Sequence, residues 1–182
     1  MDFNQVFELR RTINEFENKK VPNELVKNAI EAGNLAPCHR LTFPWRFKNI
    51  GQKKRKRISK KYLEIKSGSK SLAKNIEQKL IRKIMNSSHL IVASQIKHEE
   101  AKIDLENYAA CSCAIQNIML SLASNNIGSK WSTGRITEDR ETYEITGINS
   151  EKEKIIGFIF IGLGKIPPKI KRPKLETIYS EI

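Results

Sequence analysis

Residues 103–123 constrain the fold more than any other segment. The run contains no glycine or proline, and small and apolar residues cover most of a helical circumference, namely Ala109, Ala110, Cys111, Ala114, Ile115, Ile118, Met119 and Leu122. A helix that is apolar nearly all round is buried on all sides. We therefore expect a central helix, closely packed by other helices, that ends at Asn126 and Gly128.

Apolar runs around this helix predict a sheet. Residues 89–96 (HLIVASQI) and 153–164 form continuous apolar runs typical of buried strands, and residues 44–50 alternate like a half-buried strand. Helical patterns occupy residues 2–10, the stretch from Pro22 to before Pro37, and residues 53–65, 72–85 and 138–146. We interpret residues 67–69 and the SKWSTG run (129–134) as loops. The chain, residues 1–182, is predicted to be one α+β layered domain with about four or five strands.

The last residues, KIPPKIKRPKLETIYSEI, contain three prolines and show no periodicity. They predict an extended C-terminal arm. A long arm is stable only where it lies on something, and a partner subunit is one candidate.

Positive charge is concentrated in one segment. The formal net charge is +13, and KKRKRISKK (Lys53–Lys61) carries much of it. A solvated helix face explains this run, and a nucleic-acid contact is the alternative. The 7% aromatic content and the lack of a glycine-aromatic RNA motif argue against that alternative. No apolar run reaches 18 residues, so no membrane contact is expected, and the cysteines lack disulfide-framework spacing. These features predict a cytoplasmic protein with reduced thiols.

Common catalytic motifs are missing from the sequence. It has no Gly-x-Ser-x-Gly elbow, no Walker phosphate loop and no GxGxxG. His98-Glu99-Glu100-Ala101-Lys102 begins like a zincin helix, but Lys102 stands where the second histidine is required. Cys111 and Cys113 point to different faces of the buried helix, so core packing explains them better than a metal site.

Polar clusters capable of binding anions do remain, each at the end of a regular element, where binding residues commonly lie. They are Arg10-Arg11-Thr12, His39-Arg40, Trp131-Ser132-Thr133-Gly134-Arg135 and Lys169–Lys174. The guanidinium fork suits phosphate, and a Ser-Thr-Gly loop offers hydroxyls and backbone N–H groups. Each cluster alone also has a structural explanation, as a helix end, a turn or a basic tail.

Taken in order, these segments resemble the FMN-dependent nitroreductases. RRTINEF is similar to that family's Arg-Arg-Ser-x-Arg-x-Phe opening, and APCHRLTFPWRF to its Ala-Pro-Ser/Asp…Gln-Pro-Trp-x-Phe segment. The run IKHEEAKIDLENYAACSCAIQNIMLSLASNNIGSKWSTG resembles its central helix and Gly-x-x-Trp-x-Ser/Thr-Gly loop, and IIGFIFIGLGKIPPK with KRPKLETI resembles its last strand and closing arm. The match covers essentially the whole chain and is best with the short NAD(P)H nitroreductases, which carry Ala-Pro-Asp-His.

The resemblance implies a layered fold with a mainly antiparallel central sheet flanked by helices. It also implies a homodimer with FMN at the subunit interface. The implied activity is ping-pong transfer from NAD(P)H through FMN to a nitroaromatic, quinone or similar acceptor. The cofactor supplies the chemistry, so no catalytic side chain is assigned. The resemblance assigns FMN contacts to Arg10, Arg11, Thr12, Asn14, His39, Trp131, Ser132, Thr133, Gly134 and Arg172.

Four departures from the family pattern bear on cofactor affinity. Asn14 replaces the second basic residue, which removes a phosphate contact, Leu35 replaces an arginine, and Leu41 and Phe43 replace an Asn and a Gln. Weaker FMN binding is the resulting hypothesis. Two alternatives stay open: a specialised flavin enzyme such as a dehalogenase, and a degenerate member that binds anions or nucleic acid without catalysis. The acceptor and the choice between NADH and NADPH are left open.

Overall fold

A four-stranded antiparallel sheet organises the molecule. The computed structural model describes residues 2–68 and 71–182. Its strands are β1 (Trp45–Asn49), β2 (His89–Ile96), β3 (Gly128–Ser132) and β4 (Glu153–Gly162), in the order β1-β2-β4-β3. The two long apolar strands therefore lie in the middle, as their sequence predicts, and the two short strands form the edges.

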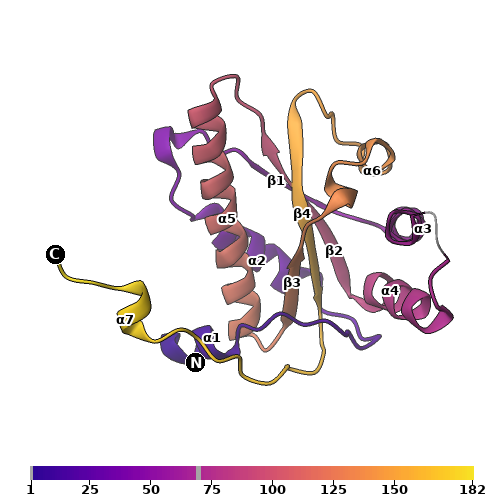
Figure 1. The fold of residues 1–182 in the computed structure, drawn as a ribbon, viewed down its shortest axis with the longest axis horizontal. Coiled ribbons are helices and arrows are strands. Elements are labelled where there is room, and N and C mark those ends of the chain that lie inside the picture. Colours follow the sequence, from indigo (N-terminus) through magenta and orange to yellow (C-terminus); the bar gives the residue numbers. More distant parts are fainter. Residues whose placement is uncertain (1, 69–70) are drawn as a thin grey trace.

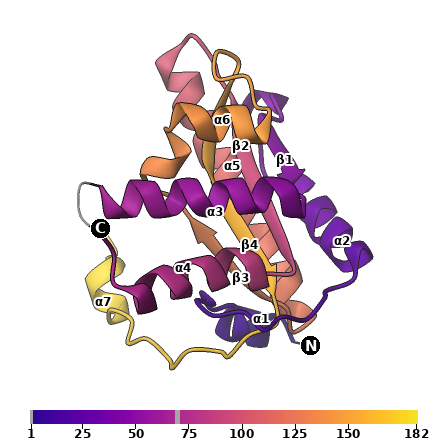
Figure 2. The same ribbon diagram turned by 90° about the vertical axis from the view of Figure 1, so that its right-hand side faces the viewer.

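Helices cover both faces of this sheet (Figures 1 and 2). On one face lie α2 (Asn23–Asn34) and α5 (Ala101–Ser124), and on the other lie α3 (Gln52–Ser67), α4 (Lys74–Asn86) and α6 (Arg140–Thr146). Short α1 (Phe3–Leu9) and α7 (Leu175–Ile178) lie at the two ends of the chain, and two 3-10 turns span His39–Leu41 and Arg135–Thr137. The predicted α+β layered fold is confirmed. Among the described residues, no helix is long and apolar enough to cross a membrane.

The central strands supply two separate cores. From β4, Ile156, Ile159 and Ile161 pack on the α5 side, whereas Ile155, Phe158 and Phe160 pack on the α3–α4 side. The alternation changes phase at Gly157, where the β2–β4 register shifts. Side chains from both faces of β4 are thus buried, which explains its continuous apolar sequence.

Three details differ from the sequence predictions. Residues 129–134 were expected to form a loop, but Gly128–Ser132 is an edge strand paired with β4. The arm contains the short helix α7, which its prolines did not suggest. Helix α5 is not buried all round in a single chain, because Leu105 is 69% exposed and Tyr108 38% exposed. Of the loop expected at residues 67–69, residue 69 lies outside the described residues.

The basic run of α3 divides into buried and exposed parts. Arg55 is buried and donates hydrogen bonds to the carbonyl oxygens of Ile50 (2.8 Å), Ser87 (2.6 Å) and Ser88 (3.0 Å). Lys61 pairs with Glu141 at 2.6 Å and with Glu64 at 3.1 Å. Lys61 is half-buried, and the other basic residues of the run are exposed. Arg55 is therefore structural and cannot contact nucleic acid.

Candidate functional site

The segment after α1 carries most of the predicted binding residues. It leaves the helix at Arg10 in an extended conformation, and Thr12 forms an isolated parallel bridge with Ser129 of β3. The Ile13 amide donates to the Ser129 carbonyl at 3.1 Å, and the Glu17 amide donates to the Leu163 carbonyl at 2.8 Å. The segment is thus fixed against β3 and the end of β4, although it has no regular structure of its own.

Two glycines let this segment approach so closely. A Cβ atom at Gly128 would lie 2.6 Å from Ile13 Cγ1, and one at Gly164 would lie 2.7 Å from Ile13 Cγ2. Since real side-chain contacts do not reach such distances, any larger residue would displace the segment. The buried side chain of Ile13 then turns Thr12 and Asn14 toward solvent, because neighbours in an extended chain point to opposite faces.

Arginines gather at the start of the segment. The pKa of Arg10 lies below its ordinary value. Burial is the largest cause, followed by the charge of Arg172 in the C-terminal arm and then by that of Arg11. Arg11 donates to the Pro168 carbonyl, and Lys169 pairs with Glu8 at 3.0 Å, which fixes the arm against α1. Within residues 2–68 and 71–182, no carboxylate pairs with any of the three arginines. This end of the segment is an uncompensated cationic site suited to an anion.

Lysines gather at its other end. The Lys130 ammonium of β3 donates to Asn14 Oδ1 at 2.5 Å, and its charge acts on the Lys83 ammonium of α4. Lys83 Nζ lies 4.6 Å from the centroid of the Phe160 ring. Burial, then Lys130, then Lys66 lower the pKa of Lys83 to about 8. In the described part of the chain, neither Lys83 nor Lys130 has a carboxylate within 4.0 Å.

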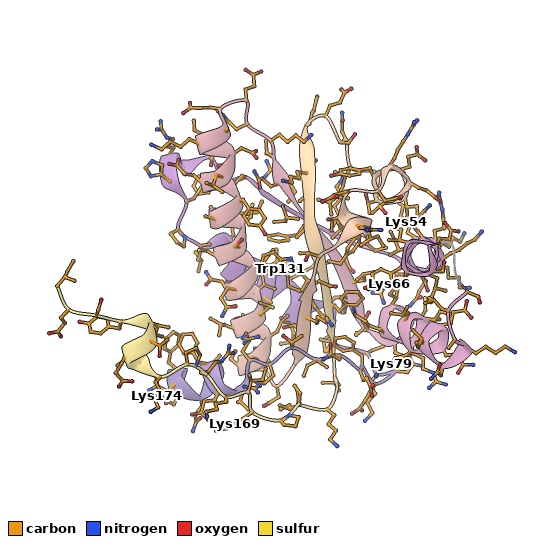
Figure 3. All side chains as sticks on the ribbon, in the orientation of Figure 1. Lys54, Lys66, Lys79, Trp131, Lys169 and Lys174 are labelled. Atoms are coloured by element: carbon orange, nitrogen blue, oxygen red, sulfur yellow. The ribbon has the colours of Figure 1, made fainter. Side chains whose placement is uncertain are left out.

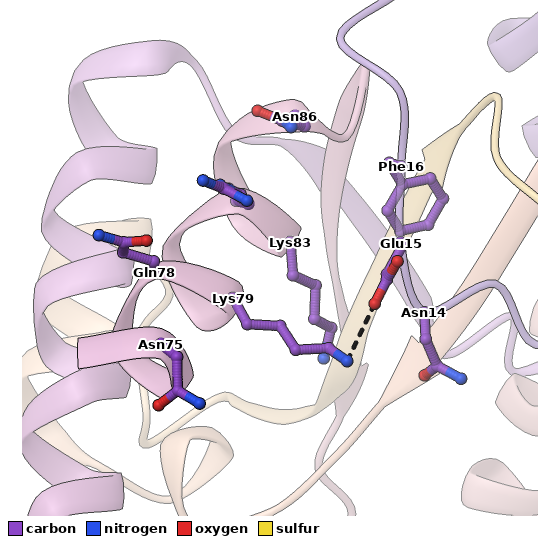
Figure 4. A pocket seen from close by; sticks show the side chains of 9 residues that line it. Asn14, Glu15, Phe16, Asn75, Gln78, Lys79, Lys83 and Asn86 are labelled. Atoms are coloured by element: carbon purple, nitrogen blue, oxygen red, sulfur yellow. Dashed lines mark ion pairs between the residues drawn. The ribbon is translucent and has the colours of Figure 1, made fainter. Parts of the chain in front are cut away.

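Figure 4 shows the hollow beside this lysine pair, which has a volume of about 360 Å³. Its walls come from α4 and from the segment around Asn14, and Lys83 and Asn14 both contribute to its lining. Lys79 crosses it to pair with Glu15 at 2.9 Å. Lys79 is therefore compensated, unlike Lys83.

The Trp131–Gly134 run continues from β3 into an exposed turn. The Trp131 indole donates to the Ile156 carbonyl at 3.2 Å and packs on the α5-side core, where it lies near the centre of the molecule (Figure 3). Ser132 is half-buried, whereas Thr133 and Gly134 are exposed, and Gly134 has a φ of 121°. Since a left-handed φ favours glycine, this turn presents accessible backbone near the lysine-bearing strand.

His39 lies apart from the other predicted residues. Its 3-10 turn is on the far side of α5 from β3 (Figure 1), and His39 Nε2 is 3.9 Å from Glu106 Oε2 of α5. The same oxygen lies 3.9 Å from Arg40 Nε and has no hydrogen-bond partner among the described residues. One chain therefore assembles Arg10, Thr12, Asn14 and the β3 turn, but not His39.

Sequence reasoning missed the two lysines of this site. Lys83 follows the inward stripe of α4, where it adjoins buried Ile84. A lysine on the apolar side of a helix is unusual and could have singled it out. Lys130 had no such signal, because its strand was not predicted.

Comparison with known proteins agrees with this geometry. Residues 8–163 match the model of the Nitroreductase family. The chain is 27% identical over 169 residues to the Bacillus subtilis protein named "Putative NAD(P)H nitroreductase YfhC", covering 90% of this chain and 84% of that one. It is 28% identical over 167 residues to "Putative NAD(P)H nitroreductase YdjA" of Escherichia coli, covering 89% and 88%.

Solved structures share the fold at lower identity. A nitroreductase-like family protein from Bacillus cereus has a TM-score of 0.83 and 22% identity, covering 100% of this chain and 96% of that one. A nitroreductase from Bacteroides fragilis, solved with bound FMN, has a TM-score of 0.77 and 20% identity, with 100% of both chains covered. These likenesses extend over the whole chain, including the segment that carries Arg10 and Asn14.

Proposed function

The chain belongs to the nitroreductase family, and from that membership and the site geometry we propose that it is an NAD(P)H-dependent FMN oxidoreductase. One observation carries the proposal. The segment from Arg10 to Asn14 joins a cluster of arginines to a pair of lysines, none of which has a carboxylate partner among the described residues. Four residues of extended chain separate the two ends, roughly 13 Å at about 3.3 Å per residue.

The chemistry of these donors fits FMN. The phosphate group suits Arg10, Arg11 and Arg172, because guanidinium groups stay charged and donate in pairs. Thr12 is exposed between the two ends and offers a hydroxyl for the ribityl chain. The electron-rich pyrimidine edge of the ring suits Asn14 and the lysines beside it. A free phosphate ion, in contrast to FMN, would contact only the arginine end of the segment.

FMN held by these residues would supply hydride transfer between NAD(P)H and a nitroaromatic, quinone or similar acceptor. The protein's own residues bind and orient it. Ser132 and Thr133 offer hydroxyls beside the ring, Gly134 lets the backbone approach, and Trp131 stiffens the strand through its bond to Ile156. No side chain of the site is needed as a nucleophile or general base.

A homodimer completes this site. In one chain, α5 exposes Leu105 and Tyr108. Leu35, at the end of α2, is 83% exposed, and Leu41, in the 3-10 turn, is 71% exposed. A second copy is the occupant that fits, because α5 has the sequence of a helix covered on all sides. His39, on the far side of α5, would then serve the flavin of the second subunit. A cytoplasmic location remains a prediction.

An absorbance spectrum of the purified protein tests the proposal first. We expect flavin bands that bleach when NADH or NADPH is added without oxygen. A colourless protein that takes up no added FMN would refute the proposed function.

Flavin-fluorescence titration then tests the arginine end. We expect Arg10→Ala to weaken FMN binding on the order of tenfold or more, the value of a charge-assisted hydrogen bond. Arg11→Ala should cost less, because Arg11 already donates to the Pro168 carbonyl. Riboflavin, which lacks the phosphate, should bind both variants as it binds the wild type. Equal losses for the two variants would contradict the assignment.

A further inference from the structure

The lysine end of the site departs from the pattern of the family that the chain resembles. We propose that Lys130, held by Asn14, supplies with Lys83 a two-lysine receptor for the pyrimidine edge of the flavin ring. This inference rests on the proposed function, because it requires the ring to lie along the Arg10–Asn14 segment. It goes further by naming what Lys130 does there.

The geometry of Lys130 supports this role. Its ammonium is fixed by Asn14 Oδ1 at 2.5 Å, and Asn14 is itself fixed because Ile13 is pinned to β3. An asparagine at position 14 can accept this hydrogen bond, whereas a lysine there would repel Lys130. The identities of residues 14 and 130 are therefore linked, because the Asn14 amide positions the Lys130 ammonium.

The repulsion between the two lysines points to a ligand. Two protonated ammonium groups have no acceptor to offer each other, since –NH₃⁺ only donates. Lys83 is held between the Phe160 and Tyr62 rings, at 4.6 and 5.6 Å from their centroids, which favours a cation but adds no carboxylate. An electron-rich group that accepts from both ammoniums removes the conflict.

The charged groups around the pair are mostly cations. Lys66 of α3 and Lys130 of β3 both act on Lys83, and Arg82 of α4 lines the same hollow. The acid of the hollow among the described residues is Glu15, and it is already paired with Lys79. The site therefore favours an anionic or electron-rich ligand over a neutral one, and favours it more after reduction adds negative charge to the ring.

Affinity for the ring should depend on pH. Since the pKa of Lys83 is about 8, the free protein carries both charges below that pH and loses the charge on Lys83 above it. Ring binding should therefore weaken as pH rises through about 8. Removal of Lys130 takes away one cause of the lowered Lys83 pKa, although burial remains. The loss of ring affinity should therefore occur at a higher pH in that variant.

Titration of the flavin-free protein with riboflavin tests the proposal, because riboflavin lacks the phosphate and reports the lysine end alone. We expect Lys130→Met to raise the dissociation constants of riboflavin and FMN by the same factor, on the order of tenfold. The midpoint potential of the bound flavin should fall, because a charge that favours the reduced form is lost. Lys130→Arg should retain most of the affinity.

Two further variants make the test specific. Asn14→Lys combined with Lys130→Met returns the charge to position 14 and should recover affinity. Lys56→Met removes an exposed lysine of α3 that does not line the hollow, and should change neither constant. If Lys130→Met folds by circular dichroism but binds riboflavin like the wild type, the proposal is refuted. Should that variant not fold, wild-type riboflavin affinity that stays constant from pH 7 to 9.5 refutes it. A wild type that binds neither flavin refutes the proposed function instead.

Discussion

Arg55 offers the sharpest prediction about the frame that holds the site. It is only 3% exposed and donates to three backbone carbonyls, those of Ile50, Ser87 and Ser88. Each hydrogen bond from a charged donor contributes about 1.5–3 kcal/mol. Burial of the guanidinium, which lowers its pKa, offsets part of that sum. We therefore expect Arg55→Met to lower the free energy of unfolding by about 3–5 kcal/mol.

Equilibrium unfolding in urea, followed by circular dichroism, measures this loss. Arg55→Lys should recover only part of it, because one ammonium cannot span three carbonyls as a planar fork does. Arg57→Met is the matched control, since this exposed residue of the same helix should change stability by no more than about 0.5 kcal/mol. The reasoning is refuted if Arg55→Met unfolds within about 1 kcal/mol of the wild type.

Two further predictions concern β4 and α5. Gly157 has a φ of 155°, and a Cβ atom there would lie 2.6 Å from Trp131 Cδ1. Gly157→Ala should therefore cost about 2–4 kcal/mol and shift the tryptophan fluorescence, and an unchanged spectrum would argue against this packing. Leu105→Asp places a charge on the open face of α5 and should convert the proposed homodimer to monomers, which sedimentation velocity measures. A wild type that already sediments as a monomer would refute the dimer.

Much of the fold could be predicted because its central elements carry strong patterns. The strand at His89–Ile96 and the helix around Ile103–Ala123 are long and apolar, so local pattern and tertiary position agree. The β3 strand could not be predicted, because its five residues include Gly128 and Lys130 and pair with a strand on one side only. Its conformation comes from β4 and from the bridge to Thr12, which a local pattern does not contain.

The open face of α5 illustrates a different limit. An apolar helical surface shows that something covers it, but the pattern is the same whether the cover is another element or a second chain. The single chain leaves Leu105 and Tyr108 exposed, so no element among the described residues covers them fully. The family resemblance assigns both His39 and Arg10 to FMN, although in one chain α5 lies between the His39 turn and β3.

Charge in this protein is informative only after its partners are known. Of the basic run, Arg55 is satisfied by carbonyls and Lys61 by two glutamates, so two of its charges have structural roles. Among the described residues, Arg10 at one end of the candidate site and Lys83 at the other have no carboxylate partner. Lys83 lies one turn before the Ser87 carbonyl that Arg55 holds. Loss of Arg55 should therefore disturb the lysine end of the site first, so that riboflavin affinity declines in that variant under conditions where the sheet is still folded.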